Sequence, residues 1–190
     1  MNKDQLRELL RSVRDGEESV DGALQALQAL GVEDLGFARI DHHRTVRCGA
    51  PEVIFCEGKS APQVASIAES IMESDADLLA TRATREQYDA VHEKCPEARY
   101  HEAGRCIVYA QEEKPDVGRV AIVTAGTSDL PVAEEARITC DLMGNETDLL
   151  SDVGVAGIHR LLAHTERLQQ ANVLVVAAGM EGALAGGVGG

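Results

Sequence analysis

One stretch of the chain, Val120–Pro131 (VAIVTAGTSDLP), constrains the fold more than any other. Its run of apolar, mostly β-branched residues is typical of a strand that is buried on both faces of a parallel sheet. Gly126 allows a tight reversal, and the residues Thr127 to Asp129 are of types favoured at helix N-termini. Pro131 then falls in the first helical turn, where its missing N–H is tolerated. The stretch therefore predicts a strand–turn–helix unit whose turn presents backbone amides to an anionic ligand.

The second half of the chain continues this alternation of strands and helices. Strands are expected at 120–125, 146–152 and 173–178, with helices at about 130–143 and 157–170. Such alternation predicts an α/β fold with a parallel sheet and right-handed crossovers. The polar segment 111–118 contains Pro and Gly and separates the halves, so we expect two domains, 1–112 and 118–190.

The first half is expected to form a small α/β domain that begins with two amphipathic helices. Leucine and valine recur at helical spacing within its first thirty residues. Further along, Ser60 and Thr84 begin sequences typical of capping boxes, which predict the start of two more helices. Strands are expected at 36–41, 53–56, 77–82 and 106–109.

The charge and composition of the chain limit the kinds of molecule that it could bind and the compartment in which it could work. A net charge of −14 over 190 residues argues against a nucleic-acid or membrane-surface protein, because either would need a basic face. The sequence has no apolar run of membrane-spanning length and no apolar segment of signal-peptide type near Met1, so we expect a cytoplasmic protein. The five cysteines are scattered and never in CxxC spacing, which favours reduced thiols over disulfides or a zinc site.

Three turns that follow strands are expected at one edge of the parallel sheet. They would bring together backbone amides, hydroxyls and the carboxylates of Asp129, Asp152 and Glu181. Carboxylates in a desolvated site can act as general bases or hold a substrate hydroxyl. A helix N-cap explains Asp129 equally well, and a turn position explains Asp152 equally well. Glu181 lies in a turn between glycines and has little structural reason to be there.

Two groups of basic residues could bind an anionic substrate. His159 and Arg160 follow the second turn, where an arginine can bind phosphate in bidentate fashion, although a solvated pair explains them equally well. The cluster Asp41–Arg44 with Arg47 is the densest polar group in the chain. Adjacent histidines on a strand face opposite sides, so no metal site is predicted there, and anion binding by Arg44 is the better interpretation.

Several strings together resemble the LarB family, whose second domain is similar to the PurE-type aminoimidazole ribonucleotide carboxylases. The matching strings are GFARIDHHR (36–44), PEVIFCEGK (51–59), TAGTSDLPVAEEA (124–136), DVGVAGIHR (152–160) and AGMEGAL (178–184). The resemblance runs from about residue 5 to residue 184. It implies a flavodoxin-like, PurE-like parallel sheet with helices on both faces, and a homo-oligomer whose active sites lie between subunits.

The resemblance also implies a reaction. Members of this family carboxylate the pyridinium ring of nicotinic acid adenine dinucleotide and hydrolyse its phosphoanhydride with release of AMP, during synthesis of the nickel-pincer nucleotide cofactor. CO₂ or bicarbonate would be the co-substrate, Mg²⁺ is a candidate metal for the reaction, and no tightly bound cofactor is implied. By resemblance, Thr124–Asp129 is the nucleotide-binding turn, Glu181 the acid/base of hydrolysis, and Asp129 a second catalytic candidate. The expected substrate-binding residues are Gly126, Thr127, Ser128, Asp152, Val153, Gly154, His159, Arg160, Met180, Gly182 and Arg44.

The chain also departs from the family. Family members continue with further strands and with a cysteine thiolate that adds to the pyridinium ring, and no cysteine here matches it. The glycine-rich segment 185–190 lacks the family's usual proline. We therefore expect a sheet that is incomplete at its C-terminal end and a chain that is inactive by itself. Two alternatives stay open: an aminoimidazole ribonucleotide carboxylase of purine biosynthesis, and a non-catalytic nucleotide-binding module.

Overall fold

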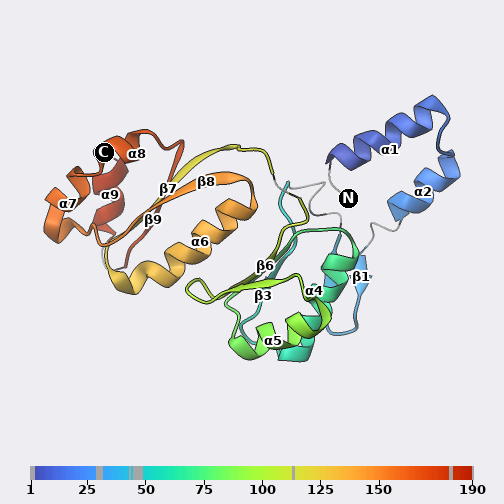
Figure 1. Cartoon of the computed structure of the whole chain (residues 1–190), viewed down its shortest axis with the longest axis horizontal. Coiled ribbons are helices and arrows are strands. Elements are labelled where there is room, and N and C mark those ends of the chain that lie inside the picture. Colours follow the sequence, from blue (N-terminus) through green and yellow to red (C-terminus); the bar gives the residue numbers. More distant parts are fainter. Residues whose placement is uncertain are drawn as a thin grey trace.

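The computed structural model describes residues 3–28, 32–42, 44, 49–112, 114–179 and 182–189. Figure 1 shows the course of the chain. The first half contains α1 (Lys3–Asp15), α2 (Val20–Gln28), β1 (Val32–Asp34), β2 (Arg39–Asp41), β3 (Val53–Phe55), α4 (Ala61–Glu73), β4 (Leu78–Thr81), α5 (Arg85–Lys94), β5 (Arg99–His101) and β6 (Cys106–Tyr109). The second half contains β7 (Gly118–Thr124), the 3-10 turn η1 (Thr127–Asp129), α6 (Leu130–Leu142), β8 (Asn145–Leu150), the 3-10 turn η2 (Val155–Gly157), α7 (Ile158–Leu162), α8 (Thr165–Gln169), β9 (Val173–Ala177) and α9 (Ala183–Gly189).

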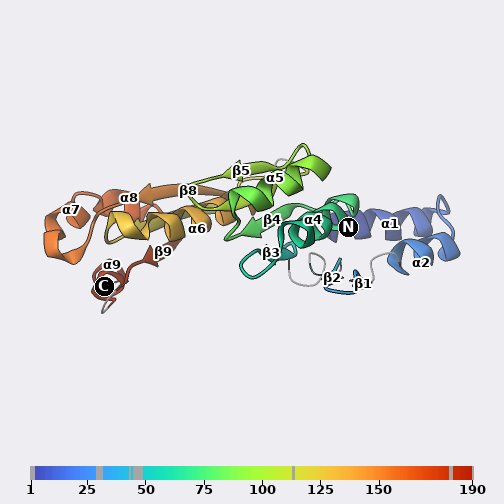
Figure 2. The same cartoon turned by 90° about the horizontal axis from the view of Figure 1, so that it is seen from below.

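The α/β class predicted from the sequence is confirmed. In the first half, a mixed sheet has the strand order β3-β4-β6-β5, in which β3 and β4 are parallel and the other pairs are antiparallel. Strand β4 is buried at all four positions, because helices cover both faces of the sheet at its centre. A separate hairpin is formed by β1 and β2. Helices α1 and α2 lie at one end of the molecule, and α7 to α9 lie at the other (Figure 2).

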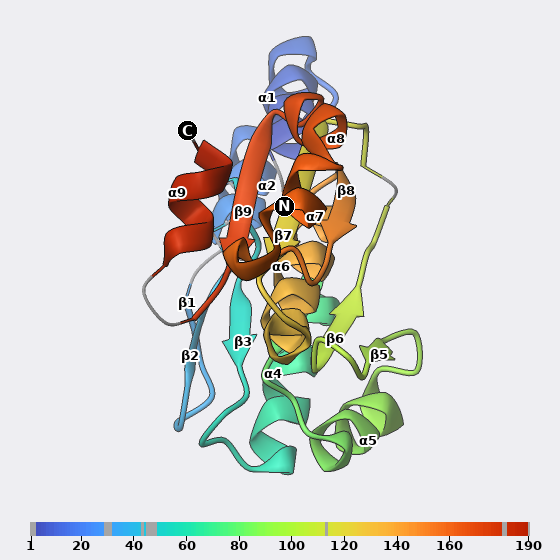
Figure 3. The ribbon, with the colours of Figure 1, turned by 90° about the vertical axis from the view of Figure 1, so that its left-hand side faces the viewer.

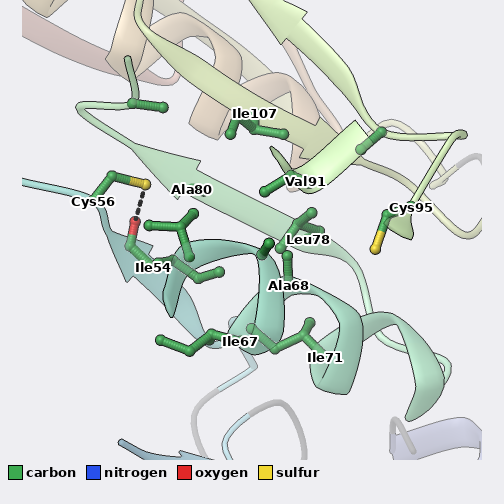
Figure 4. Close-up of a cluster of buried hydrophobic side chains, with 14 of the residues drawn as sticks. Ile54, Cys56, Ile67, Ala68, Ile71, Leu78, Ala80, Val91, Cys95 and Ile107 are labelled. Carbon is green, nitrogen blue, oxygen red and sulfur yellow. Dashed lines mark hydrogen bonds between the residues drawn. The ribbon is translucent and has the colours of Figure 1, made fainter. Parts of the chain in front are cut away.

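The core of the first half lies between the mixed sheet and helices α4 and α5 (Figure 4). The predicted cap at Thr84 is present, since its hydroxyl accepts the Gln87 N–H at 3.2 Å and the Gln87 side chain accepts the Thr84 N–H at 2.8 Å. The Gln87 amide group also donates to the carbonyls of Cys56 and Lys59. One buried glutamine therefore fixes both the start of α5 and the loop that follows β3.

The second half contains a parallel sheet with the order β8-β7-β9 (Figure 3). Alternate side chains of β7 face opposite sides. Val120 and Ile122 pack against α6, whereas Val123 packs against the side formed by α7 and α9. The expected helices on both faces of this sheet are thus confirmed.

Helix α6 is shared between the two sheets. Its residues Ala133 and Cys140 pack on the parallel sheet, while Ile138 and Leu142 pack on the mixed sheet against Leu79. An ion pair also joins α6 to the first half of the chain: the Arg82 guanidinium and the Glu135 carboxylate are 2.7 Å apart. The two halves therefore contact each other through a helix that starts at the turn after β7.

Some elements differ from those predicted. Strands β1 and β5 were not expected, because three-residue strands such as Arg99–His101 carry too little pattern to be recognised. The strand expected at 36–41 is limited to Arg39–Asp41. The helix expected at 157–170 is divided into α7 and α8, because the Thr165 hydroxyl donates to the Leu162 carbonyl and interrupts the helical ladder. Among the described residues, no helix is long and apolar enough to cross a membrane.

Candidate functional site

The first two turns of the candidate site are joined at Thr124, the last residue of β7. The Thr124 hydroxyl accepts the Asp152 N–H at 3.2 Å, and the Thr124 carbonyl accepts the Val153 N–H at 3.0 Å. The next carbonyl, of Ala125, accepts the Gly154 N–H at 3.0 Å. These bonds hold the turn after β8 directly against the turn after β7.

Asp129 shapes the turn after β7. Its carboxylate accepts the Gly126 N–H at 2.9 Å, and its own N–H donates to the Gly126 carbonyl at 3.2 Å. Asp129 therefore stands at the N-cap position of α6 but makes no side-chain cap bond to that helix, because its carboxylate turns back to the Gly126 amide. The side chains of Thr127 and Ser128 are exposed, so their hydroxyls are accessible to a ligand.

Asp152 and Arg160 form the charged part of the site. Arg160 Nη1 lies 2.5 Å from Asp152 Oδ2, and the two side chains are 41% and 55% exposed. Asp152 has a positive φ of 58°, a backbone conformation uncommon for residues other than glycine. A Cβ at Gly157 would lie 2.6 Å from Arg160 Nε, so a side chain there would require the guanidinium to shift from this position. His159, the neighbour of Arg160, is exposed.

The segment after β9 returns to the same edge of the sheet. Leu184 of α9 is 2% exposed and belongs to the cluster that contains Val153 and Leu161. Gly182 has a φ of +69°, as expected for a glycine in a turn. Two predicted site residues, Met180 and Glu181, lie outside the described residues. The chain passes from β8 on one side of β7 to β9 on the other, and ligands of open α/β sheets bind at such a switch point.

Arg44 lies in the first half of the chain, and the carboxylate nearest to it is that of Glu52 and not that of Asp152. Its Nε atom is 3.9 Å from the Glu52 Oε2 atom. That oxygen is buried and has no hydrogen-bond partner within the described part of the chain. No described contact links Arg44 to the turns after β7 and β8, so a role in binding the same ligand stays a prediction.

Thr124 was predicted only as the first residue of the nucleotide-binding turn, and the structure shows it to be a positioning residue. Its side chain is fully buried, and its hydroxyl accepts the amide of Asp152. The sequence feature that could have indicated this role is the single hydroxyl residue at the end of the apolar run Val120–Val123.

The buried thiols of the described chain are poor nucleophiles in the folded state. Burial raises the pKa of Cys56 to about 11 and that of Cys106 to about 12. Burial also raises the pKa of Cys140, which belongs to α6 and packs against the parallel sheet. These environments suit structural cysteines rather than a catalytic thiolate.

Comparisons with known proteins identify the family of the chain. The LarB/PurE-like N-terminal domain matches residues 32–112. The chain is also 33% identical, over 189 residues, to the uncharacterized protein MJ0165 of Methanocaldococcus jannaschii, an alignment that covers 94% of this chain and 74% of the relative. The chain belongs to the LarB family. The PurE-like relationship of this LarB-family chain supports carboxylase-type chemistry.

Proposed function

We propose that this chain binds nicotinic acid adenine dinucleotide at the edge formed by the turns after β7, β8 and β9, and that it serves the carboxylation and phosphoanhydride hydrolysis of that substrate in nickel-pincer cofactor synthesis. The observation that carries the proposal is the hydrogen-bonded junction of Thr124 and Ala125 with residues Asp152–Gly154. It brings an arginine and exposed hydroxyls beside the switch point of a parallel sheet, a position suited to a phosphorylated ligand.

Individual residues take distinct roles in this proposal. Arg160 binds phosphate with the guanidinium edge left free by Asp152, and the hydroxyls of Thr127 and Ser128 donate to phosphate oxygens. Asp129 keeps the turn in shape through the Gly126 amide. His159 is available at the rim. Residues Val153, Gly154 and Gly182 supply backbone to the same edge, and Met180, outside the described residues, is proposed to join them by resemblance to the family.

Glu181 is proposed as the acid/base of hydrolysis. Its carboxylate takes a proton from water, the water oxygen bonds to phosphorus, and the phosphoanhydride P–O bond breaks to release AMP. CO₂ or bicarbonate supplies the new carboxyl group, and Mg²⁺ would offset charge on the phosphates. A homo-oligomer would complete sites between subunits. Because no cysteine of this sequence matches the family's thiolate, we expect binding without turnover in this chain alone.

A calorimetric titration tests the binding step. We expect the dinucleotide to bind the chain, and Arg160→Ala to weaken it by about tenfold, as for loss of a charge-assisted hydrogen bond. The matched control is Arg119→Ala. This substitution breaks an exposed ion pair with Glu146 where β7 and β8 begin, at the other end of the strands from the proposed site. Equal affinity of both variants and the unmodified chain would rule out the proposed phosphate site.

A second measurement separates the possible reactions. AMP release is followed with bicarbonate and Mg²⁺ in a complete LarB-family member, before and after changing the residue that aligns with Glu181 to Gln. Loss of AMP release with retained binding supports the acid/base role, and unchanged release contradicts it. If aminoimidazole ribonucleotide displaces the dinucleotide from this chain at lower concentration, the purine-pathway carboxylase is the correct alternative. Binding with no reaction in either protein would favour a nucleotide-binding module.

A further inference from the structure

The helices α1 and α2 form a hairpin that contacts little of the rest of the chain. Figure 1 and Figure 2 both show the two helices beside each other at one end of the molecule. Within the described residues, each of them makes extensive contact only with the other. Helices of thirteen and nine residues are marginal by themselves in water, because most helical stability in proteins comes from packing of an apolar face. The hairpin is therefore expected to pack against a further surface.

The hairpin leaves several large apolar side chains uncovered. Four others are half-buried within it, namely Leu6, Leu9, Val13 and Leu27. The uncovered ones are Leu10, Val20 and Leu24, which are 56%, 65% and 50% exposed. Val20 and Leu24 are four residues apart and therefore share one side of α2. Pairing of α1 with α2 thus buries only part of the apolar surface that the two helices carry.

A basic side of α1 borders this uncovered surface. Arg7, Arg11 and Arg14 recur at intervals of four and three residues, so they lie on one side of the helix, and all three are exposed. Leu10 comes three residues after Arg7 and four before Arg14, which places it at the border of that side. Antiparallel pairing of two α1 helices along this border would set arginines opposite arginines. The rest of the chain is acidic instead, since residues 29–190 carry 26 acidic and 14 basic residues.

The mixed sheet has an open apolar side at its edge strand β3. Val53 and Phe55 lie on the same face, because side chains alternate along a strand, and they are 38% and 51% exposed. Val53 is paired with Leu79 of β4, which belongs to the face on which α6 packs. Glu57, also exposed, follows the strand.

This face of the mixed sheet has room for a second helix. The opposite face is covered by two helices, α4 and α5. On the open face, α6 makes its extensive contact with β6, which is separated from β3 by β4. Sheet faces of α/β proteins are normally covered by helices, so a helix is the expected cover for Val53 and Phe55.

We propose that the α1–α2 hairpin of one chain packs on the β3 side of the mixed sheet in a second copy of this chain. The uncovered leucines of the hairpin then cover Val53 and Phe55, and the arginines of α1 approach the Glu57 carboxylate. A second copy is required because the hairpin makes no extensive contact with β3 of its own chain. The same contact made in both directions gives a closed two-fold dimer. The contact does not depend on the proposed nucleotide edge, because the two share no residue.

Sedimentation velocity of the whole chain over a range of concentrations tests this contact. We expect a monomer–dimer equilibrium that added salt shifts toward monomer, because salt screens the attraction between arginine and carboxylate. Leu24→Glu in the hairpin and Phe55→Glu in the sheet should each weaken dimerisation by about tenfold or more. The control is Leu162→Glu, which changes an exposed leucine in the second half of the chain and should leave dimerisation unchanged.

Mixing the two variants separates loss of the contact from loss of the fold. Leu24→Glu keeps an intact sheet surface, and Phe55→Glu keeps an intact hairpin. The mixture should therefore form a dimer held by one of the two contacts, although each variant alone is monomeric at the same concentration. A variant that had failed to fold would not recover association in the mixture.

The remaining outcomes each overturn the proposal. The mass of a single chain at every concentration would show that no second copy binds. Unchanged dimerisation of Phe55→Glu would exclude the sheet surface and indicate pairing between hairpins. Loss of dimerisation in Leu162→Glu alone would assign the interface to the second half of the chain, and no recovery in the mixture would contradict the exchange of hairpins. Failure of dinucleotide binding to respond to Arg160→Ala bears only on the proposed function.

Discussion

The amide of Gly154 donates a hydrogen bond to the carbonyl of Ala125 at 3.0 Å, and a Cβ at position 154 would lie 2.9 Å from that same oxygen. The turns after β7 and β8 can therefore approach this closely only when residue 154 has no side chain. The contact holds Asp152 beside the start of α6, which is where the proposed phosphate site is formed.

Gly154→Ala should consequently destabilise the chain by about 1–3 kcal/mol, as for other insertions into tight contacts. The measurement is urea unfolding followed by circular dichroism. Gly126→Ala is the matched control in the same site, because Gly126 has a φ of −144° and a Cβ there would find its nearest neighbour, Ser128 Oγ, at 4.0 Å. Equal stability of the two variants would show that the turns can separate without loss.

Gly104→Ala should loosen the contact between the two halves of the chain. A Cβ at Gly104 would lie 2.8 Å from Ile138 Cδ1 and 3.0 Å from the backbone of Glu134 and Glu135 in α6. Backbone atoms of a helix cannot move aside singly, so we expect a loss of about 1–3 kcal/mol in the free energy of unfolding. Gly179→Ala, where a Cβ would meet nothing within 4 Å, is the control. A Gly104→Ala variant as stable as this control would contradict the packing of α6 on the mixed sheet.

Stability should depend on pH through Glu33 in β1. Hydrogen bonds from Ser70, at 2.5 Å, and from His42, at 3.1 Å, lower the pKa of Glu33 below its ordinary value of about 4.3. A lowered folded-state pKa contributes stability that is present above pH 4.3 and is lost as pH falls through the folded value. Ser70→Ala should reduce this dependence between about pH 5 and pH 3, measured by urea unfolding at each pH. If the stability of Ser70→Ala fell with decreasing pH as steeply as that of the unmodified chain, Ser70 would not stabilise the Glu33 carboxylate.

Cys56 and Cys106 should resist alkylation in the folded chain. With pKa values of about 11 and about 12, only about one thiol in a thousand or fewer is ionised at pH 8, and the thiolate is the reactive form. Treatment with iodoacetamide followed by mass spectrometry should leave both unmodified, and the same treatment in urea should label both. Rapid labelling of Cys56 before unfolding would contradict its burial.

Local patterns predicted the parts of this fold that depend on neighbouring residues. The strand and turn of Val120–Pro131 were predicted from its apolar run and its N-capping residues, and the start of α5 from Thr84 and Gln87. The parallel pairing of β7 with β8 and β9 follows from the alternation of elements, because a crossover helix returns each strand in the same direction.

Other parts depended on residues distant in the sequence. The periodicity of α6 indicates an apolar face but not that Ile138 would pack on a second sheet, and β5 is too short to produce a pattern. Thr124 and Asp152 are separated by 28 positions, and only the register of β7 with β8 brings the hydroxyl to that amide.

By itself, therefore, the sequence determined the order of most of the strands and helices and the residue types available at each turn, since both are set by contacts within a few positions. The tertiary structure decided which turns meet and that helix α6 is shared between the two sheets. Those outcomes come from packing between distant segments, which bury apolar surface whatever their separation along the chain.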